Sequence, residues 1–241
     1  MIKILLTQIS LFYILFPFIM EKINSSWIKY DKEDFFPIQN LPYAVCKNLK
    51  TDVISCYSRI SKTAINLSVL EQSGLLDDKH KFDKKTFSQS TLNYFASLGR
   101  DVSKQVRAKL TEIFSDEKYS NTLEVQKSLE QISDLQCLLP VSIPDYTDFY
   151  SSRNHAYNVG SFFRPTNPLQ PNWVHLPVGY HGRSSTIVVD GTKVRRPRGQ
   201  VKKSKDLEEP IFSDSKRLDY EVEMGVILGK SNEMGKPIKV D

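Results

Sequence analysis

The chain has 241 residues, of which 40% are hydrophobic and 25% charged, and it carries a net charge of +5. This composition is ordinary for a soluble globular protein with one large domain or two modest ones. The mild positive charge suits an acidic small-molecule ligand at least as well as nucleic acid, and no RNA- or DNA-binding motif accompanies it, so we expect no nucleic-acid partner.

The three cysteines, Cys46, Cys56 and Cys137, are an odd number and show no CxxC or metal-ligand spacing. This argues against a disulfide framework and favours a reducing compartment. We therefore expect free, buried or half-buried thiols and a cytoplasmic protein.

Residues 1–20 differ from the rest of the chain, because they form an apolar stretch interrupted by polar residues and Pro17. As a secretory signal peptide the stretch lacks a small-x-small cleavage site, and as a membrane span it is short. A third interpretation, that Met20 is the true start, is favoured by the polar sequence that follows it. We treat residues 1–26 as an extension outside the fold and expect no membrane partner.

Residues 27–140 predict a small α+β domain. The prolines in 36–45 indicate extended or turn structure, and 53–67 is typical of one or two strands. Two helices are predicted from apolar residues on one face, the first with Asp101 as its N-cap. The first stripe contains Val102, Val106, Leu110, Ile113 and Phe114, and the second Leu123, Val125, Leu129 and Ile132.

Residues 141–241 predict short strands and turns, with the domain boundary near 138–145, where Pro140 and Pro144 interrupt the helical pattern. Asp190-Gly191 lies between β-branched runs, which is typical of a hairpin. A basic loop is expected around 195–205, and the alternation in 218–228 predicts a strand.

Three carboxylates in the last predicted strand, Asp219, Glu221 and Glu223, alternate with apolar residues and therefore share one face. If that face is exposed, the pattern is only a solvated strand. If it lines a cleft, two carboxylates at i and i+2 are suitable ligands for a hard divalent cation such as Ca²⁺ or Mg²⁺. The segment alone leaves both interpretations open.

The stretch 144–165 concentrates acids, tyrosines, arginines and a histidine. Asp148 lies just ahead of a predicted helix over 149–159, which Gly160 would end, and His155 follows Asp148 by two helical turns. A histidine can take a proton from water near neutral pH, and Arg164 could bind a carboxylate with two hydrogen bonds. Downstream, Tyr180 lies in a glycine-rich turn with room to approach a ligand.

Four motifs together resemble the fumarylacetoacetase family, over a match that runs from about residue 35 to the end of the chain. The motifs are 36–43 (FPIQNLPY), 145–156 (DYTDFYSSRNHA), 171–183 (PNWVHLPVGYHGR) and 218–224 (LDYEVEM). The resemblance implies a homodimer with an N-terminal SH3-like barrel (27–140) and a β-rich catalytic domain (141–241, incomplete).

The same resemblance implies the site. Asp148, Glu221 and Glu223 would hold Ca²⁺ or Mg²⁺, His155 would be the general base, and Tyr150, Arg164 and Tyr180 would contact the substrate fumarylacetoacetate. The reaction would cleave a carbon–carbon bond with water, giving fumarate and acetoacetate, as in the last step of tyrosine degradation. Family members continue beyond the position of Asp241 and supply further ligands there, so we expect little activity from this chain alone.

Two other interpretations remain at this point. The chain could be another oxo-acid hydrolase or decarboxylase of the same superfamily, although the N-terminal domain and the DFYSS stretch favour fumarylacetoacetase. It could also be a non-catalytic, dimer-forming protein that retains the fold.

Overall fold

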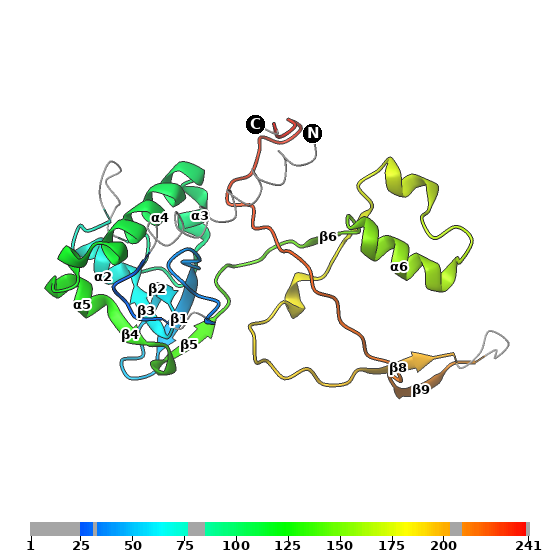
Figure 1. Cartoon of the computed structure of the whole chain (residues 1–241). Helices are drawn as coiled ribbons and strands as arrows, with labels where there is room; N and C mark the ends of the chain where they lie inside the picture. Colours follow the sequence, from blue (N-terminus) through cyan, green and yellow to red (C-terminus); the bar gives the residue numbers. More distant parts are fainter. Residues whose placement is uncertain (1–24, 31–32, 77–84, 203–208, 240–241) are drawn as a thin grey trace, which may run out of the picture. The chain divides into compact units, whose positions relative to one another are not determined.

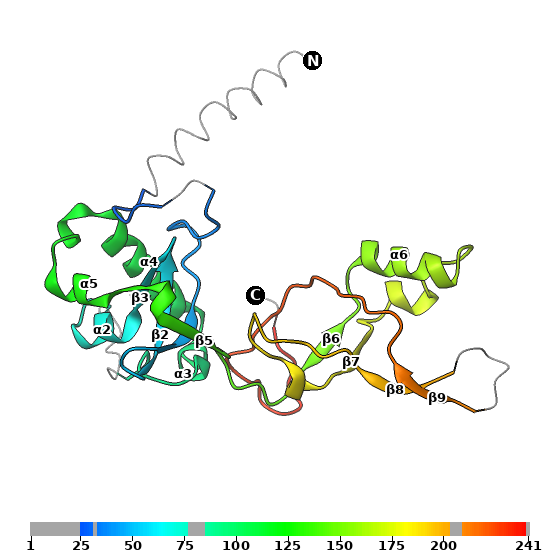
Figure 2. The same ribbon diagram turned by 90° about the horizontal axis from the view of Figure 1, so that it is seen from below.

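The computed structural model describes residues 25–30, 33–76, 85–202 and 209–239, and Figures 1 and 2 show it from two directions. The chain divides into two compact units, Met1–Pro140 with Asp190–Asp241, and Val141–Val189. No helix among the described residues is long and apolar enough to cross a membrane. The expectations for residues 1–20 lie outside the described residues.

The first unit is built on a curled antiparallel sheet of five strands in the order β4-β3-β2-β1-β5. Its central strands are consecutive in the chain, and β5 joins the far side of β1. The α+β class is confirmed, and so are the strands predicted within 53–67. The strands are β1 (Ala44–Asn48), β2 (Ile54–Ile60), β3 (Thr63–Asn66), β4 (Leu129–Gln131) and β5 (Leu135–Leu138).

The hairpin between β2 and β3 turns through two residues, because Ile60 pairs with Thr63. Ser61 takes a positive φ of 49° in this turn. Its backbone N–H donates to the carbonyl of Phe36 at 2.7 Å, and its hydroxyl donates to the Asp34 carboxylate at 2.8 Å. The preceding segment therefore holds the turn, and the turn sets the register between β2 and β3.

The two faces of this sheet bury different side chains. One face carries Val45, Cys56, Ile60 and Ile65, all with no exposed surface. The opposite face, which we call the Tyr57 face, carries Cys46, Tyr57 and Ala64 in a second cluster, with the Glu130 carboxylate accepting hydrogen bonds from side chains around it. The donors to Glu130 are Asn48, Tyr57 and Asn66.

Helices α2 (Leu67–Gln72), α3 (Asn93–Ser97), α4 (Arg100–Ser115) and α5 (Leu123–Ser128) gather around the sheet. The first predicted helix is confirmed as α4, whose buried residues are Val106, Leu110, Ile113 and Phe114. Its N-cap is Gly99 rather than Asp101, which lies in the first turn. Short 3₁₀ turns η1 (Glu117–Tyr119) and η2 (Ile132–Asp134) complete this region.

The second predicted helix is only partly correct. Leu123 and Val125 lie in α5, but the helix ends at Ser128, and the remaining two apolar residues belong to β4 and η2. Leu129 instead pairs with Ile65 at the edge of the sheet. The pairing offered by β3 therefore overrides a helical pattern that the local sequence could have continued.

A buried acid joins α2 to the loop that follows it. The Glu71 side chain is only 1% exposed, and its two oxygens accept hydrogen bonds from the backbone N–H groups of Thr86 and Phe87 at 2.9 and 3.0 Å. A buried carboxylate needs such donors, because an unsatisfied buried polar group is costly. These bonds hold Phe87 in the core, where its side chain is fully buried.

The second unit pairs β6 (Thr147–Phe149) with β7 (Gly179–His181), and its helix α6 spans Arg153–Phe163. The predicted bounds of this helix and its end at Gly160 were wrong. Ser152 is the N-cap, and its side chain accepts a hydrogen bond from the backbone N–H of His155. Gly160 lies inside the helix and is buried, because the backbone of Pro168 occupies the place that a Cβ would take. Turns η3 (Pro171–Val174) and η4 (Ser184–Thr186) complete the unit.

Beyond residue 190 the described chain holds one hairpin, β8 (Arg198–Val201) with β9 (Ile211–Asp214), in the region predicted as a basic loop. The predicted hairpin at Asp190-Gly191 was wrong: Gly191 turns with a φ of 77°, but no strand flanks it. The predicted strand over 218–228 was also wrong, because that segment has no regular secondary structure and pairs with no described strand.

Candidate active site

The ribbon formed by β6 and β7 brings two of the predicted site residues together. Asp148 pairs directly with Tyr180, so their side chains leave the same face of the ribbon. Gly179 allows the two strands to approach closely at this pair, because a Cβ at position 179 would meet the backbone carbonyl oxygen of Asp148. Tyr180 is 61% exposed, and Asp148 is half-buried.

The ladder continues one residue further and adds Tyr150 to this face. The backbone N–H of Tyr150 donates to the carbonyl of Val178 at 2.8 Å, and its carbonyl accepts from the indole N–H of Trp173 at 2.7 Å. Tyr150 follows Asp148 by two positions on an extended backbone, so both side chains point to the same side. Two hydrogen bonds thus hold the backbone of Tyr150 in place.

His155 meets Tyr150 directly. Their rings lie edge to face with centroids 5.5 Å apart, and the Tyr150 hydroxyl donates to the carbonyl of Ala156 at 3.3 Å. His155 is in the first turn of α6 and half-buried, and Ser152 caps that turn. The helix start therefore carries the imidazole to the same end of the ribbon as the tyrosine.

The Asp148 carboxylate has a neighbour that the sequence analysis did not single out. The Tyr146 hydroxyl donates to Asp148 Oδ2 at 2.7 Å. Gly182 makes room for the Tyr146 ring, since a Cβ there would overlap it. The i, i+2 spacing of Tyr146 and Asp148 on a strand was the available signal, because such residues share a face.

Arg164 lies at the opposite end of α6 from His155, where it is the C-cap residue. The two positions are nine residues apart in the sequence, which corresponds to roughly 14 Å along the helix axis. One end of its guanidinium donates to the carbonyl of Pro168 at 3.0 Å, while its buried Nε has no hydrogen-bond partner among the described residues. The structure thus holds Arg164 near the turn after α6 rather than beside the imidazole.

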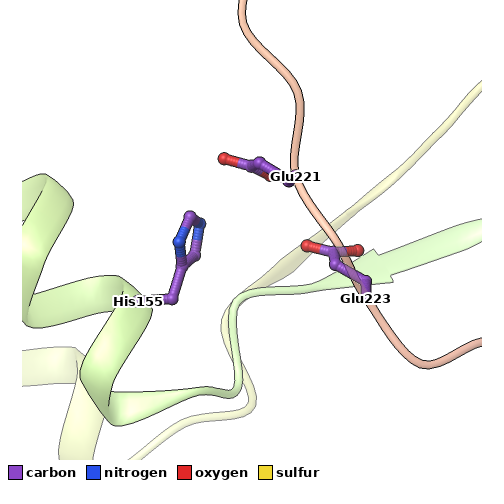
Figure 3. A group of neighbouring side chains, drawn as sticks. All are labelled: His155, Glu221 and Glu223. Carbon is purple, nitrogen blue, oxygen red and sulfur yellow. The ribbon is translucent and has the colours of Figure 1, made fainter.

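Glu221 and Glu223 lie on the extended segment after β9 and are both exposed. Figure 3 shows the two carboxylates on this segment and the imidazole of His155 on α6. The remaining histidines of the motif region, His175 and His181, are also exposed; His181 Nε2 lies 3.4 Å from Asp145 Oδ1. The hydrogen bonds and ring contacts given above for Asp148, Tyr150 and His155 involve neither of these two histidines.

Family models match the chain in two consecutive parts. Residues 39–140 match the model described as fumarylacetoacetase N-terminal, and residues 146–238 match the model described as fumarylacetoacetate (FAA) hydrolase C-terminal. The first match covers the five-stranded sheet and its helices. The second covers the β6–β7 ribbon, α6 and the segment with the two glutamates.

Curated relatives agree with these models. A fumarylacetoacetase from Dictyostelium discoideum is 44% identical over 224 residues, which is 91% of this chain and 52% of the relative. Relatives with the same name from Aspergillus fumigatus and Arabidopsis thaliana are each 40% identical over 90% of the chain, which covers 53% and 52% of their lengths.

The chain spans about half the length of the curated relatives it matches. Within that span, both domain models follow in the order expected from the sequence motifs, and the motif residues form the ribbon and helix start described above. The chain therefore belongs to the fumarylacetoacetase family, and it corresponds to an N-terminal portion of the proteins in that family.

Proposed function

We propose that the whole protein hydrolyses the carbon–carbon bond of fumarylacetoacetate to give fumarate and acetoacetate, the last step of tyrosine catabolism. The observation that carries this proposal is the contact between Tyr150 and His155 beside Asp148, in a segment that matches the C-terminal family model. The names of the relatives supply the substrate, and the local geometry supplies residues suited to its chemistry.

His155 would act as the general base. A neutral imidazole can take a proton from water as the oxygen attacks the carbonyl next to the fumaryl group. The backbone N–H of His155 donates to the Ser152 hydroxyl, and the imidazole ring of His155 lies against Tyr150. The imidazole is therefore held in place before substrate arrives. Such positioning matters because proton transfer requires hydrogen-bond reach between base and water.

Asp148, Glu221 and Glu223 would hold a divalent cation, Ca²⁺ or Mg²⁺. The donor set fits such an ion, because all three residues offer carboxylate oxygens, which hard cations prefer. The Tyr146 hydroxyl donates a hydrogen bond to the Asp148 carboxylate, and both glutamates are exposed. When bound, the ion would polarise the diketone oxygens and stabilise the departing enolate.

Three further residues would contact the substrate. Tyr150 and Tyr180 leave the same face of the ribbon as Asp148, so both side chains can contact the substrate next to that carboxylate. Arg164 would bind a terminal carboxylate of the substrate, at a distance from the reacting carbonyl set by the length of α6. Fumarylacetoacetate carries a carboxylate at each end, and either can accept hydrogen bonds from a guanidinium.

The finer features of the fold and assembly are part of the same proposal. The curled sheet of the N-terminal region would be an SH3-like barrel, and residues 141–241 would contribute to a β-rich catalytic domain. The protein would act in the cytoplasm as a homodimer.

The test uses the protein expressed from its complete gene and freed of metal with a chelator. We expect fumarate and acetoacetate to form from fumarylacetoacetate only after Mg²⁺ or Ca²⁺ is restored. Asp148→Asn should raise the cation concentration needed for half-maximal rate by at least about tenfold, because it removes a charged ligand. Asp145→Asn, which alters an exposed carboxylate beside His181, is the matched control and should leave that concentration unchanged.

The competing functions give different results in the same assay. Turnover of acylpyruvates or oxo-acids without turnover of fumarylacetoacetate would assign the protein to another activity of the superfamily. A folded protein with no turnover of any of these substrates would indicate a non-catalytic role.

A further inference from the structure

Two cysteines lie directly opposite each other on neighbouring strands of the first unit. Cys46 is on β1 and Cys137 is on β5, and the ladder pairs them residue to residue. Their Sγ atoms are 3.5 Å apart, close enough for a thiol hydrogen bond. The two residues are separated by 91 positions in the sequence, so the fold alone brings these thiols together.

The backbone geometry is compatible with a covalent bond between them. Directly opposed residues of an antiparallel pair have Cα atoms about 4.5–5.5 Å apart, and disulfides span Cα separations of about 4.4–6.8 Å. The sulfur atoms need to approach from 3.5 Å to about 2.05 Å, which small changes in the two side-chain torsions can supply. The sheet therefore does not have to open for the bond to form.

The two thiols differ in access to solvent. Cys137 is exposed on β5, which is at the edge of the sheet, whereas Cys46 is only 3% exposed and packs against Tyr57 and Ala64. Burial raises the pKa of the Cys46 thiol to about 12, with a further contribution from its contact with Cys137. A soluble oxidant therefore reaches Cys137 first. The buried Cys46 then reacts with the modified Cys137 from within the fold.

The third cysteine cannot take part. Cys56 is on β2 opposite Val45, and Val45 precedes Cys46 by one residue, so the two cysteine side chains leave opposite faces of the sheet. Its Sγ instead faces the carbonyl of Gln89 at 3.7 Å. Cys56 thus serves as an internal control, present in the same chain and buried away from the pair.

We propose that Cys46 and Cys137 form a reversible dithiol–disulfide pair that closes when the protein meets a small disulfide oxidant such as oxidised glutathione. The Cys137 thiolate attacks one sulfur of the oxidant, forms a mixed disulfide and releases the first glutathione thiolate. Cys46 then loses its proton, attacks Cys137 Sγ and displaces the second glutathione. The protein loses two electrons and two protons, and one oxidised glutathione becomes two reduced molecules.

Closure would link the edge strand to its neighbour. Strand β5 leads through Leu139 and Pro140 into the second unit, and the bond would join it covalently to β1 on the Tyr57 face. A bond across a long loop restricts the unfolded chain. The oxidised chain should therefore unfold at a higher temperature than the reduced chain, and a reductant should reverse the shift. This proposal does not depend on the enzymatic function.

The test treats the folded chain with oxidised glutathione, alkylates the remaining thiols after denaturation, and measures the intact mass and its peptides. We expect the number of alkylated thiols to fall from three to one, with Cys56 carrying the label and one linked peptide pair containing Cys46 and Cys137. Cys56→Ser should form the same bond and retain no free thiol. Three alkylated thiols, a bond that includes Cys56, or a bond between two chains would overturn the proposal.

Two single variants test the order of the reaction. In Cys46→Ser the Cys137 mixed disulfide with glutathione should persist, because no second thiol can displace it. In Cys137→Ser the buried Cys46 should remain unmodified under the same conditions. A persistent glutathione adduct on Cys137 in the unaltered chain would overturn the proposal, and that measurement needs no variant to fold.

Discussion

The region up to Pro140 and the segment after β9 have similarly apolar sequences but opposite outcomes. In the first, residues such as Phe87, Leu110 and Phe114 lose all their exposed surface. In the second, every large apolar residue from 218 to 228 is more than half exposed: Leu218, Tyr220, Val222, Met224, Val226, Ile227 and Leu228. The difference shows that an apolar pattern forms regular structure only where partners for its backbone and side chains are at hand.

Replacing a leucine in each region gives the largest contrast. Leu110→Ala removes a fully buried side chain of α4, so we expect a loss of about 2–5 kcal/mol in the free energy of unfolding. Leu228→Ala removes a side chain that is 79% exposed and should change it by less than about 0.5 kcal/mol. Urea unfolding of the chain followed by far-ultraviolet circular dichroism measures both, and equal losses would contradict the comparison.

A buried acid gives the next largest effect. Glu71→Gln exchanges one carboxylate oxygen for an amide that cannot accept the backbone N–H it faces, so we expect a loss of about 1–3 kcal/mol. Glu117→Gln changes an exposed residue of η1 and is the control. The same unfolding experiment separates them. An unaltered stability in Glu71→Gln would mean that these hydrogen bonds do not hold Phe87 in the core.

How much of the fold could be predicted depended on how local each element is. The stripe of α4 and the strands β2 and β3 were predictable, because one element or a two-residue turn contains all the information. Leu129 was misassigned to a helix, because its partner Ile65 lies 64 positions earlier in the chain. The strand predicted over 218–228 had the correct alternation, but no described strand pairs with it.

The second unit can be tested at its tightest backbone contact. Gly160→Ala places a Cβ against the carbonyl of Pro168, so α6 must shift or the turn after it must open, at a cost of about 1–3 kcal/mol. Gly225→Ala meets no described atom within 4 Å and is the control. Hydrogen exchange of peptides from α6 should accelerate only in Gly160→Ala. Unchanged protection there would refute the proposed packing role of Gly160.

The smallest predicted effect is on the stability of the fold, and it appears only at alkaline pH. Burial raises the pKa of Tyr43 from 10.0 to about 12, and that of Cys56 from 9.0 to about 12. The unfolded chain then releases protons that the folded chain retains, so the stability that these two groups contribute is fully present below about pH 9 and is lost from about pH 9 to about pH 12. Tyr43→Phe should reduce the slope of the unfolding midpoint above pH 10. An identical slope would mean that Tyr43 does not contribute.

The candidate site was predictable in its residue types but not in its contacts. The sequence placed Asp148, Tyr150 and His155 close together, whereas the pairing of Asp148 with Tyr180 needs the register of β6 and β7. Tyr146 was missed because its hydrogen bond to Asp148 depends on the space left by Gly182. Arg164 illustrates the opposite case, since it is near His155 in sequence but at the other end of the same helix.

The most direct test of the proposed activity compares two histidines in the protein expressed from its complete gene. His155→Asn should reduce turnover of fumarylacetoacetate by about 10²–10⁴-fold, because it removes the general base, while the cation concentration for half-maximal rate stays the same. His175→Asn changes an exposed histidine of the neighbouring motif and should keep full turnover. Equal turnover in the two variants would contradict the assignment of His155 as the base.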